Sequence, residues 1–311
     1  MDEINNIDYY NLDIFKNNIH FLKYAPYNLK DNHNFFLDAI NNKMDVIQYA
    51  SFNLRNNYDI VLASVNLNGM SLEYASDDLK NNYNIVLNAV NNIGYSLKYA
   101  SDNLKNNYNI VLNAVKRNGL VLEYASEELK NNYEIVLTAI NNNEWSLDYA
   151  SNILKNNYDI VLNAVKIGGY CIKFASNELK NNYNLVLTAV ENHGVALEYI
   201  SDELKDNYNI VLTAIKKNSY PLDRISENLR NNNDIIITAL ENNDSYILYC
   251  SNNFKNNRKK MLTIYYKINF KYPNNFKPDY IIERLIKIKN IDLKFNIIKK
   301  INKLTDILFY L

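Results

Sequence analysis

The sequence is poor in the residues that make tight turns. Its 311 residues include only 6 glycines and 4 prolines, with 2 cysteines, 3 histidines and 1 tryptophan. All-β sandwiches and barrels need frequent turns rich in glycine and proline, so this scarcity argues against them. No stretch approaches about 18 consecutive uncharged apolar residues, so we expect no transmembrane helix.

Cysteine usage and the first residues of the chain bear on where it resides. Cys171 and Cys250 stand where other parts of the chain carry small or apolar residues, and two cysteines make no disulfide framework. The opening residues show neither a basic region nor an apolar run, so no secretion signal is visible. We therefore expect a reducing, cytoplasmic location, which for a viral protein means the host cytoplasm or the virion.

The sequence also lacks the patterns that carry chemistry. His20, His33 and His193 are scattered without the spacing of metal ligands. There is no glycine-rich phosphate loop and no nucleophile motif. The sequence therefore predicts no enzyme, no cofactor, no metal and no small-molecule substrate.

What the sequence does contain is a repeat of 25 residues. A serine recurs without insertion at Ser51, Ser76, Ser101, Ser126, Ser151, Ser176, Ser201, Ser226 and Ser251. A tyrosine two residues before it recurs as well, with Phe174 and Arg224 as exceptions. A unit this small cannot bury its own apolar face, so copies must stack on one another.

Each unit contains one clear helix. Tyr108, Val111, Leu112 and Val115 follow the i, i+3, i+4, i+7 spacing of one helical face, and other apolar residues widen it. Asn107 suits the N-cap, and Gly119 suits a left-handed residue just beyond the helix end. A second, shorter helix follows this turn. Ser126 then caps a one-turn connector, for which a 3₁₀ helix is one option.

The repeated motif, Leu-x-Tyr-Ala-Ser-x-x-Leu-Lys-Asn-Asn-x-x-Ile-Val-Leu-x-Ala-Val-x-x-Asn-Gly, resembles the repeat family catalogued as domain of unknown function 4116. The resemblance spans about residues 21–260. Such repeats occur in large DNA viruses, protists and some bacteria, and the family implies an architecture without an assigned activity. The sequence departs from the motif at Ile200, Arg224, Ile225 and Asn233, which suggests that the array degenerates beyond about Ile200.

These observations predict an all-α protein, an α-solenoid of about ten 25-residue two-helix repeats with a C-terminal helical cap. We expect an N-terminal cap over 1–20, the repeat array over 21–260 and a basic helical cap over 261–311. From Arg258 to Leu311 there are 13 basic and 4 acidic side chains, a net charge of +9. That leaves 21 basic and 30 acidic side chains, or −9, in the preceding residues.

Two sets of repeat positions vary and are therefore candidates for partner contact. The position after the glycine carries large side chains, which either form an exposed aromatic strip or plug the turn against the next unit; its aromatic members are Tyr95, Trp145, Tyr170 and Tyr220. A polar stripe on the long helix is either a solvated face or the lining of a groove; it comprises Asn88, Asn113, Thr138, Asn163, Thr188 and Thr213.

These features favour a non-enzymatic repeat protein that binds another protein. One alternative is a structural component of a viral particle or cell-associated assembly. Another is contact of the basic tail with nucleic acid or anionic lipid, through lysines such as Lys287, Lys299 and Lys300. The tyrosine ladders could stack on single-stranded nucleic acid. However, the acidic array would repel phosphates, so packing between repeats explains them better.

Overall fold

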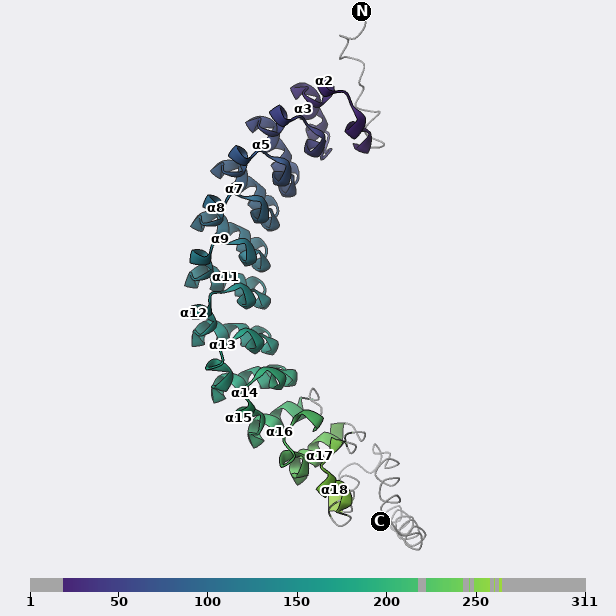
Figure 1. Cartoon of the computed structure of the whole chain (residues 1–311), viewed down its shortest axis with the longest axis vertical. Coiled ribbons are helices and arrows are strands. Elements are labelled where there is room, and N and C mark those ends of the chain that lie inside the picture. The colour runs from purple at the N-terminus through teal and green to yellow at the C-terminus, as the bar shows by residue number, and fades with distance from the viewer. Residues whose placement is uncertain are drawn as a thin grey trace, which may run out of the picture. The chain divides into compact units, whose positions relative to one another are not determined.

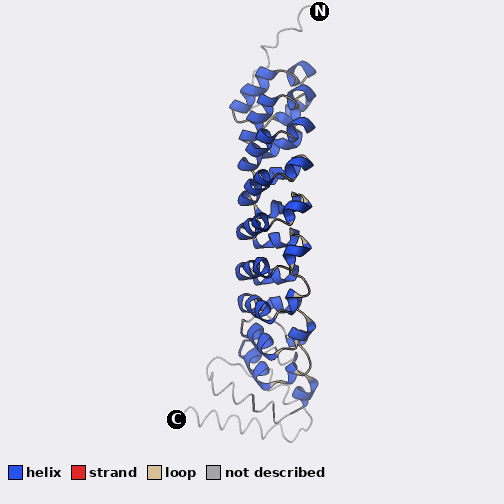
Figure 2. Ribbon diagram, turned by 90° about the vertical axis from the view of Figure 1, so that its left-hand side faces the viewer, coloured by secondary structure: helices blue, strands red, loops and turns tan. Residues whose placement is uncertain are grey.

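A computed structural model describes residues 19–217, 222–242, 246, 249–257, 260 and 263–264. The described residues form helices and connecting turns, and no strand occurs among them (Figure 2). The chain divides into two compact units, Met1–Ser176 and Asn177–Leu311. The all-α repeat architecture predicted from the sequence is confirmed in the described part of both units.

Each repeat contains a long α-helix, a 3₁₀ helix and a short third segment. In the first unit the long helices are α3 (His33–Asn41), α5 (Tyr58–Leu67), α7 (Tyr83–Asn92), α9 (Tyr108–Arg117), α11 (Tyr133–Asn142) and α13 (Tyr158–Ile167). In the second unit they are α14 (Tyr183–Asn192), α16 (Tyr208–Lys216) and α17 (Asn233–Asn242). Because α17 begins at Asn233, the long helix still forms where the motif degenerates.

The segment after the long helix is a 3₁₀ helix. In the first unit these are η2 (Ile19–Tyr24), η3 (Ile47–Tyr49), η4 (Gly69–Tyr74), η5 (Gly94–Tyr99), η6 (Gly119–Tyr124), η7 (Glu144–Tyr149) and η8 (Gly169–Phe174). The second unit has η10 (Gly194–Tyr199) and η11 (Leu222–Arg224).

The third segment is a single α-helical turn in most repeats and a 3₁₀ turn in two. The α-helical turns are α2 (Tyr27–Lys30), α4 (Phe52–Arg55), α6 (Asp77–Lys80), α8 (Asp102–Lys105), α10 (Glu127–Lys130), α12 (Asn152–Lys155), α15 (Asp202–Lys205) and α18 (Asn252–Asn256). The two 3₁₀ turns are η9 (Leu179–Asn181) and η12 (Leu229–Asn231). The predicted short second helix is therefore the 3₁₀ element, and the connector is mostly α-helical.

Stacking of these segments builds the core within each unit. In the first unit the long helices follow one another as successive layers (Figure 1), and α9 packs against α7 and α11. The fully buried side chains of α9 are Ile110, Val111, Ala114 and Val115. Tyr108 and Leu112, which we expected on the buried face, are half-buried. The buried face of α9 is therefore rotated by about one residue from the predicted face, toward Ile110 and Ala114. The packing of α9 between two neighbouring helices accounts for this difference.

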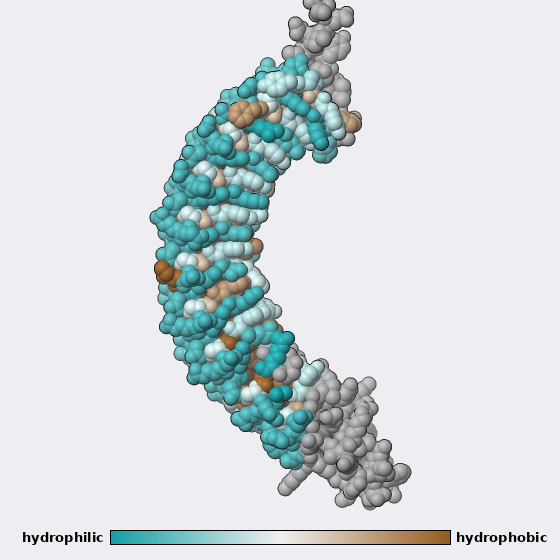
Figure 3. Space-filling model, viewed as in Figure 1, coloured by the Kyte–Doolittle hydropathy of each residue, from teal (hydrophilic) through white to brown (hydrophobic). Residues whose placement is uncertain are grey.

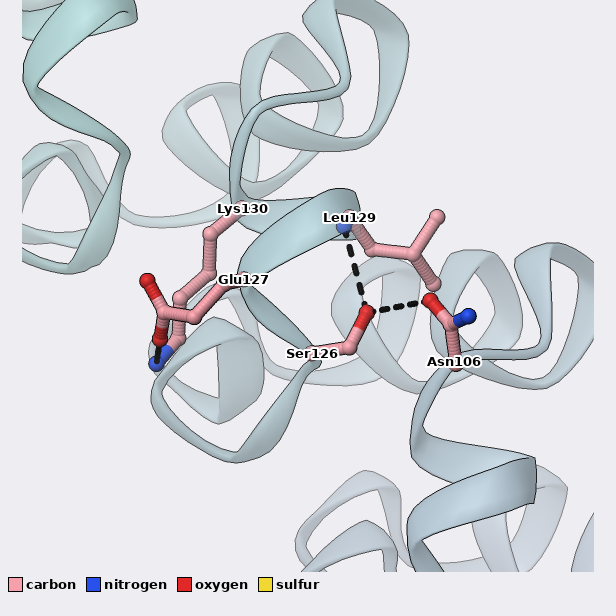
Figure 4. A network of polar contacts seen from close by, with 5 residues as sticks. All are labelled: Asn106, Ser126, Glu127, Leu129 and Lys130. Atoms are coloured by element: carbon pink, nitrogen blue, oxygen red, sulfur yellow. Dashed lines mark hydrogen bonds and ion pairs between the residues drawn. The ribbon is translucent and has the colours of Figure 1, made fainter.

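The recurring serine joins one repeat to the next. The Ser126 hydroxyl accepts from the Leu129 amide at 3.2 Å, as the predicted N-cap should, and donates to Asn106 Oδ1 of the preceding repeat at 2.5 Å (Figure 4). The Ser126 amide also donates to the Lys105 carbonyl at 3.0 Å. The hydroxyl contact recurs in the pairs Ser51–Asp31, Ser76–Asn56, Ser101–Asn81, Ser151–Asn131, Ser176–Asn156, Ser201–Asn181 and Ser226–Asp206.

Removing the Ser126 hydroxyl is expected to destabilise the protein. Ser126→Ala loses the cap of α10 and the bond to Asn106, which together contribute about 1–2 kcal/mol. Ser126→Thr keeps a hydroxyl and serves as the control. Urea unfolding followed by circular dichroism measures the difference. Equal midpoints for the alanine and threonine variants would contradict a role for the hydroxyl.

Glycine also has a role between repeats, but a different one from that predicted. No described glycine has a positive φ, so the expected left-handed residue at Gly119 is wrong. A Cβ on Gly119 would lie 2.2 Å from the Ala139 carbonyl oxygen of the next repeat. The Gly119 amide donates to Asn142 Oδ1 at 2.7 Å, and Asn142 Nδ2 donates to the Lys116 carbonyl at 3.1 Å. Glycine therefore allows two backbones to approach closely.

Candidate functional site

The residue after the glycine position contacts an aromatic ring in the next repeat. Tyr95 and Tyr124 meet edge to face with ring centroids 5.3 Å apart, and the Tyr124 hydroxyl donates to the Tyr95 hydroxyl at 2.6 Å. Trp145 and Phe174 meet in the same way, with centroids 5.6 Å apart. Both pairs are 29 residues apart in the sequence, so they link consecutive repeats.

These aromatic residues nevertheless remain partly accessible. Tyr95 is 37% exposed and Trp145 is 45% exposed, whereas Tyr170 is half-buried. Tyr220 lies outside the described residues. The two interpretations of this position are therefore not exclusive, since one side chain both packs on the next repeat and remains partly exposed to solvent. Figure 3 shows that the described surface is mostly hydrophilic on the face it views, with scattered apolar residues.

The polar stripe lies on a half-buried face of the long helices; each of Asn88, Asn113, Thr138, Asn163, Thr188 and Thr213 is half-buried. Asn88 and Asn113 each donate a side-chain hydrogen bond to the carbonyl four residues earlier, at 2.8 Å. Thr188 does the same at 3.0 Å, and Asn163 donates to Asn141 Oδ1 of the preceding repeat at 2.7 Å. These donors satisfy the chain's own acceptors, so the stripe is the weaker candidate for partner contact.

A ladder of tyrosines ends the 3₁₀ helices of the first unit, close to carboxylates. The pKa values of Tyr74 and Tyr99 are raised, first by burial and then by the negative charge of Glu73. The pKa values of Tyr124 and Tyr149 are raised by burial and by Glu123. A phenolate would be both desolvated and repelled there, so these hydroxyls stay protonated. Glu73 and Glu123 were not predicted from the sequence, in which the residue before the tyrosine is acidic in some repeats and basic in others.

Cations lie over several rings of the same ladder. The Arg55 guanidinium lies 6.0 Å from the Tyr74 ring centroid. The Lys98 ammonium lies 5.5 Å from the Tyr99 ring and 5.9 Å from the Tyr95 ring. Lys173 lies 5.5 Å from the Phe174 ring. The ladder therefore presents π faces over which a positive charge is stabilised.

The raised tyrosine pKa values predict a loss of stability at alkaline pH. Below pH 10, the ordinary tyrosine pKa, both folded and unfolded states hold these protons. Above it the unfolded chain ionises first, so the free energy of unfolding falls as pH rises toward the folded-state pKa values. Alkaline titration of tyrosine absorbance measures the tyrosine pKa values. Urea unfolding over the same pH range measures the free energy of unfolding.

Two charge-neutralising variants provide the comparison for this titration. Glu123→Gln should lower the pH at which Tyr124 and Tyr149 ionise, because one source of their pKa shift is removed. Glu127→Gln, which removes a carboxylate on α10 that pairs with Lys130, should leave it unchanged. Identical titrations for the two variants would show that Glu123 does not raise the pKa values of Tyr124 and Tyr149.

Both cysteines are buried, and neither forms a disulfide with another described residue. Burial, and secondly the charge of Glu144, raise the pKa of Cys171 to about 12, so its thiol is unsuited to nucleophilic chemistry. His193, which follows the last residue of α14 as its C-cap, is half-buried. Among the described residues no group of three or more His, Cys, Asp or Glu side chains is placed to hold a metal ion.

The sequence of the repeat matches a known family. The family model described as domain of unknown function (DUF4116) matches residues 11–55, 42–80, 57–105, 82–130, 107–155, 132–180 and 182–230. The chain belongs to this family. Each match spans parts of consecutive DUF4116 repeats, which fits a unit that is complete only when stacked. Comparison with curated proteins and with solved structures gave no match.

No described helix of this DUF4116 array has the length and apolar character needed to cross a membrane. The predicted basic cap over 261–311, including Lys287, Lys299 and Lys300, lies outside the described residues except for 263–264. Its contact with nucleic acid or anionic lipid stays a prediction.

Proposed function

We propose that this DUF4116 protein is a non-enzymatic scaffold that binds another protein through the aromatic edge of its stacked repeats. The observation that carries the proposal is the exposure of Tyr95 and Trp145 at a variable position of an otherwise regular array. Aromatic side chains held by packing lose little conformational entropy on binding, which makes them effective contact residues. We also place the protein in a reducing compartment such as the cytoplasm, in keeping with two buried cysteines that form no disulfide among the described residues.

The inter-repeat bonds support this role because they hold the contact residues in register. Ser126 and Asn142 each link their own repeat to the preceding one through two or more hydrogen bonds. A partner would therefore meet rings at fixed spacing within the first unit. Pre-ordering of this kind lowers the entropic cost of association.

Site-specific photocrosslinking in the native cell tests the proposal. A photoreactive phenylalanine analogue at Trp145 or Tyr95 should form an adduct with one defined protein. The same analogue at Asn103, an exposed position on α8, is the control. Adducts that are absent at both aromatic positions, or the same at all three, would refute binding through this edge.

A further inference from the structure

Five residues of the first unit form a compact aromatic and acidic surface, which we call the Glu123 cluster: Tyr95, Glu123, Tyr124, Asp148 and Tyr149. Tyr124 joins Tyr95 through the hydroxyl bond of 2.6 Å, and the Glu123 carboxylate lies close enough to the Tyr124 hydroxyl to help raise its pKa. The Tyr149 hydroxyl lies close enough to the Glu123 and Asp148 carboxylates for both to raise its pKa. Three consecutive repeats therefore contribute to one surface.

Within the described residues the cluster has an unbalanced negative charge. Asp148 lies 3.9 Å from the Lys155 ammonium, whereas Glu123 has no lysine or arginine within ion-pair distance in the described part of the chain. Lys98 lies over Tyr95 at one border of the cluster. No cation of the described residues lies over Tyr124 or Tyr149, although Tyr74, Tyr99 and Phe174 at the equivalent positions each have one.

The second unit shows what the chain itself places at the equivalent positions. Glu198 is the counterpart of Glu123, and Arg224 takes the position of Tyr149, since each lies 75 residues further on. The Arg224 guanidinium forms an ion pair with the Glu198 carboxylate. At this place in the repeat a guanidinium therefore fits beside the carboxylate. In the first unit that cation is replaced by a neutral ring.

We propose that the Glu123 cluster binds an arginine side chain of the partner protein. A guanidinium can form a two-pronged hydrogen bond with the Glu123 carboxylate while its flat face covers the Tyr124 or Tyr149 ring. Cation–π attraction and the charged hydrogen bond then act on the same group. This inference rests on the proposed function, because it takes the ligand to be part of a protein.

Titration of the full chain with blocked peptides tests this assignment. The probes are a glycine–serine peptide with one arginine, and the same peptide with citrulline or lysine in its place. Ring resonances of isotopically labelled tyrosines report binding. The arginine peptide should shift the Tyr124 and Tyr149 resonances to saturation. Citrulline, which is isosteric but neutral, should not, and lysine should bind more weakly because its ammonium cannot form the two-pronged bond.

Two variants with the same change in charge localise the site. Glu123→Gln should weaken binding of the arginine peptide by at least about tenfold, because a hydrogen bond to a charged group is lost. Glu127→Gln should leave it unchanged, since that carboxylate pairs with Lys130 outside the cluster. Tyr149→Arg should abolish binding by supplying the internal guanidinium seen at Arg224. Thermal unfolding confirms that each variant is folded.

The proposal is overturned if the arginine and citrulline peptides bind alike, if lysine binds as well as arginine, or if both glutamine variants weaken binding equally. The titration needs no natural partner, and the photocrosslinking needs no arginine. An arginine peptide that binds without any crosslinked protein would therefore refute only the scaffold function. A crosslinked protein without arginine binding would refute only the present inference.

Discussion

Gly119→Ala is expected to lower the free energy of unfolding by about 3 kcal/mol, because the added methyl group has no room. Its Cβ would lie 2.2 Å from the Ala139 carbonyl oxygen and 2.7 Å from Ser146 Oγ. The carbonyl belongs to the backbone of α11, so relief requires two repeats to separate. Separation would also lengthen the bond from the Gly119 amide to Asn142. Urea unfolding of the full chain measures the loss.

Gly168→Ala is the matched control for this prediction. A Cβ at Gly168 would meet Glu144 Cγ at 3.0 Å and Glu144 Oε1 at 3.1 Å, which belong to a flexible side chain that can move aside. Its φ is −140°, so alanine fits the backbone there without strain. We expect little change in stability for this variant. A Gly119→Ala midpoint equal to that of Gly168→Ala would show that the contact with Ala139 does not limit the spacing of the repeats.

Leu122→Ala is expected to cost about 2–5 kcal/mol, as for other fully buried leucines. Leu122 on η6 is 0% exposed, and η6 packs against α9, α11 and η7. Truncation would leave a cavity that the surrounding helices fill only partly, since each is also tied to its own neighbours. The loss should appear in both the urea and the thermal unfolding curves.

Leu120→Ala removes the same atoms from the same 3₁₀ helix, two residues earlier. Leu120 is 37% exposed, so we expect a loss below about 1 kcal/mol. Both variants replace leucine with alanine in the same 3₁₀ helix, so residue type and helix propensity are matched. The difference between the two losses of stability therefore reports the effect of burial. Similar losses for the two variants would mean that η6 does not contribute a buried face to the stack.

Several features of the fold could be predicted from the sequence because they depend on short-range geometry. The spacing of Val111 and Val115 requires a helix with a buried face, and the N-cap roles of Asn107 and Ser126 follow from side chains that reach an amide three residues on. The 25-residue register further implies stacking, since one unit buries too little apolar surface alone.

The prediction for Gly119 was wrong for a physical reason. A glycine after a helix fits two explanations equally well, a left-handed backbone or a close approach by another segment. The sequence contains no information that separates them. The Ala139 carbonyl of the next repeat lies so close to Gly119 that close approach is the correct explanation.

The candidate site was likewise predictable from the sequence only in part. The sequence identified Tyr95 and Trp145 as variable aromatic positions, and it left open whether they pack or face solvent. It did not identify Glu123, whose significance depends on Tyr124 beside it and on Tyr149 one repeat further on. Likewise, Arg224 looked like a lapse from the motif until it was found paired with Glu198 across the interface of two repeats.

The sequence by itself determined that this chain is a helical array, where each long helix starts, and which side chains recur at equivalent positions. These follow from periodicity and from contacts within a few residues. Only the tertiary structure decided which glycine contacts limit the repeat spacing, which ring meets which, and which carboxylates lack an internal cation in the described part of the chain. Those are properties of the interface between copies, and they depend on the distance and rotation from one repeat to the next, which a linear period does not specify.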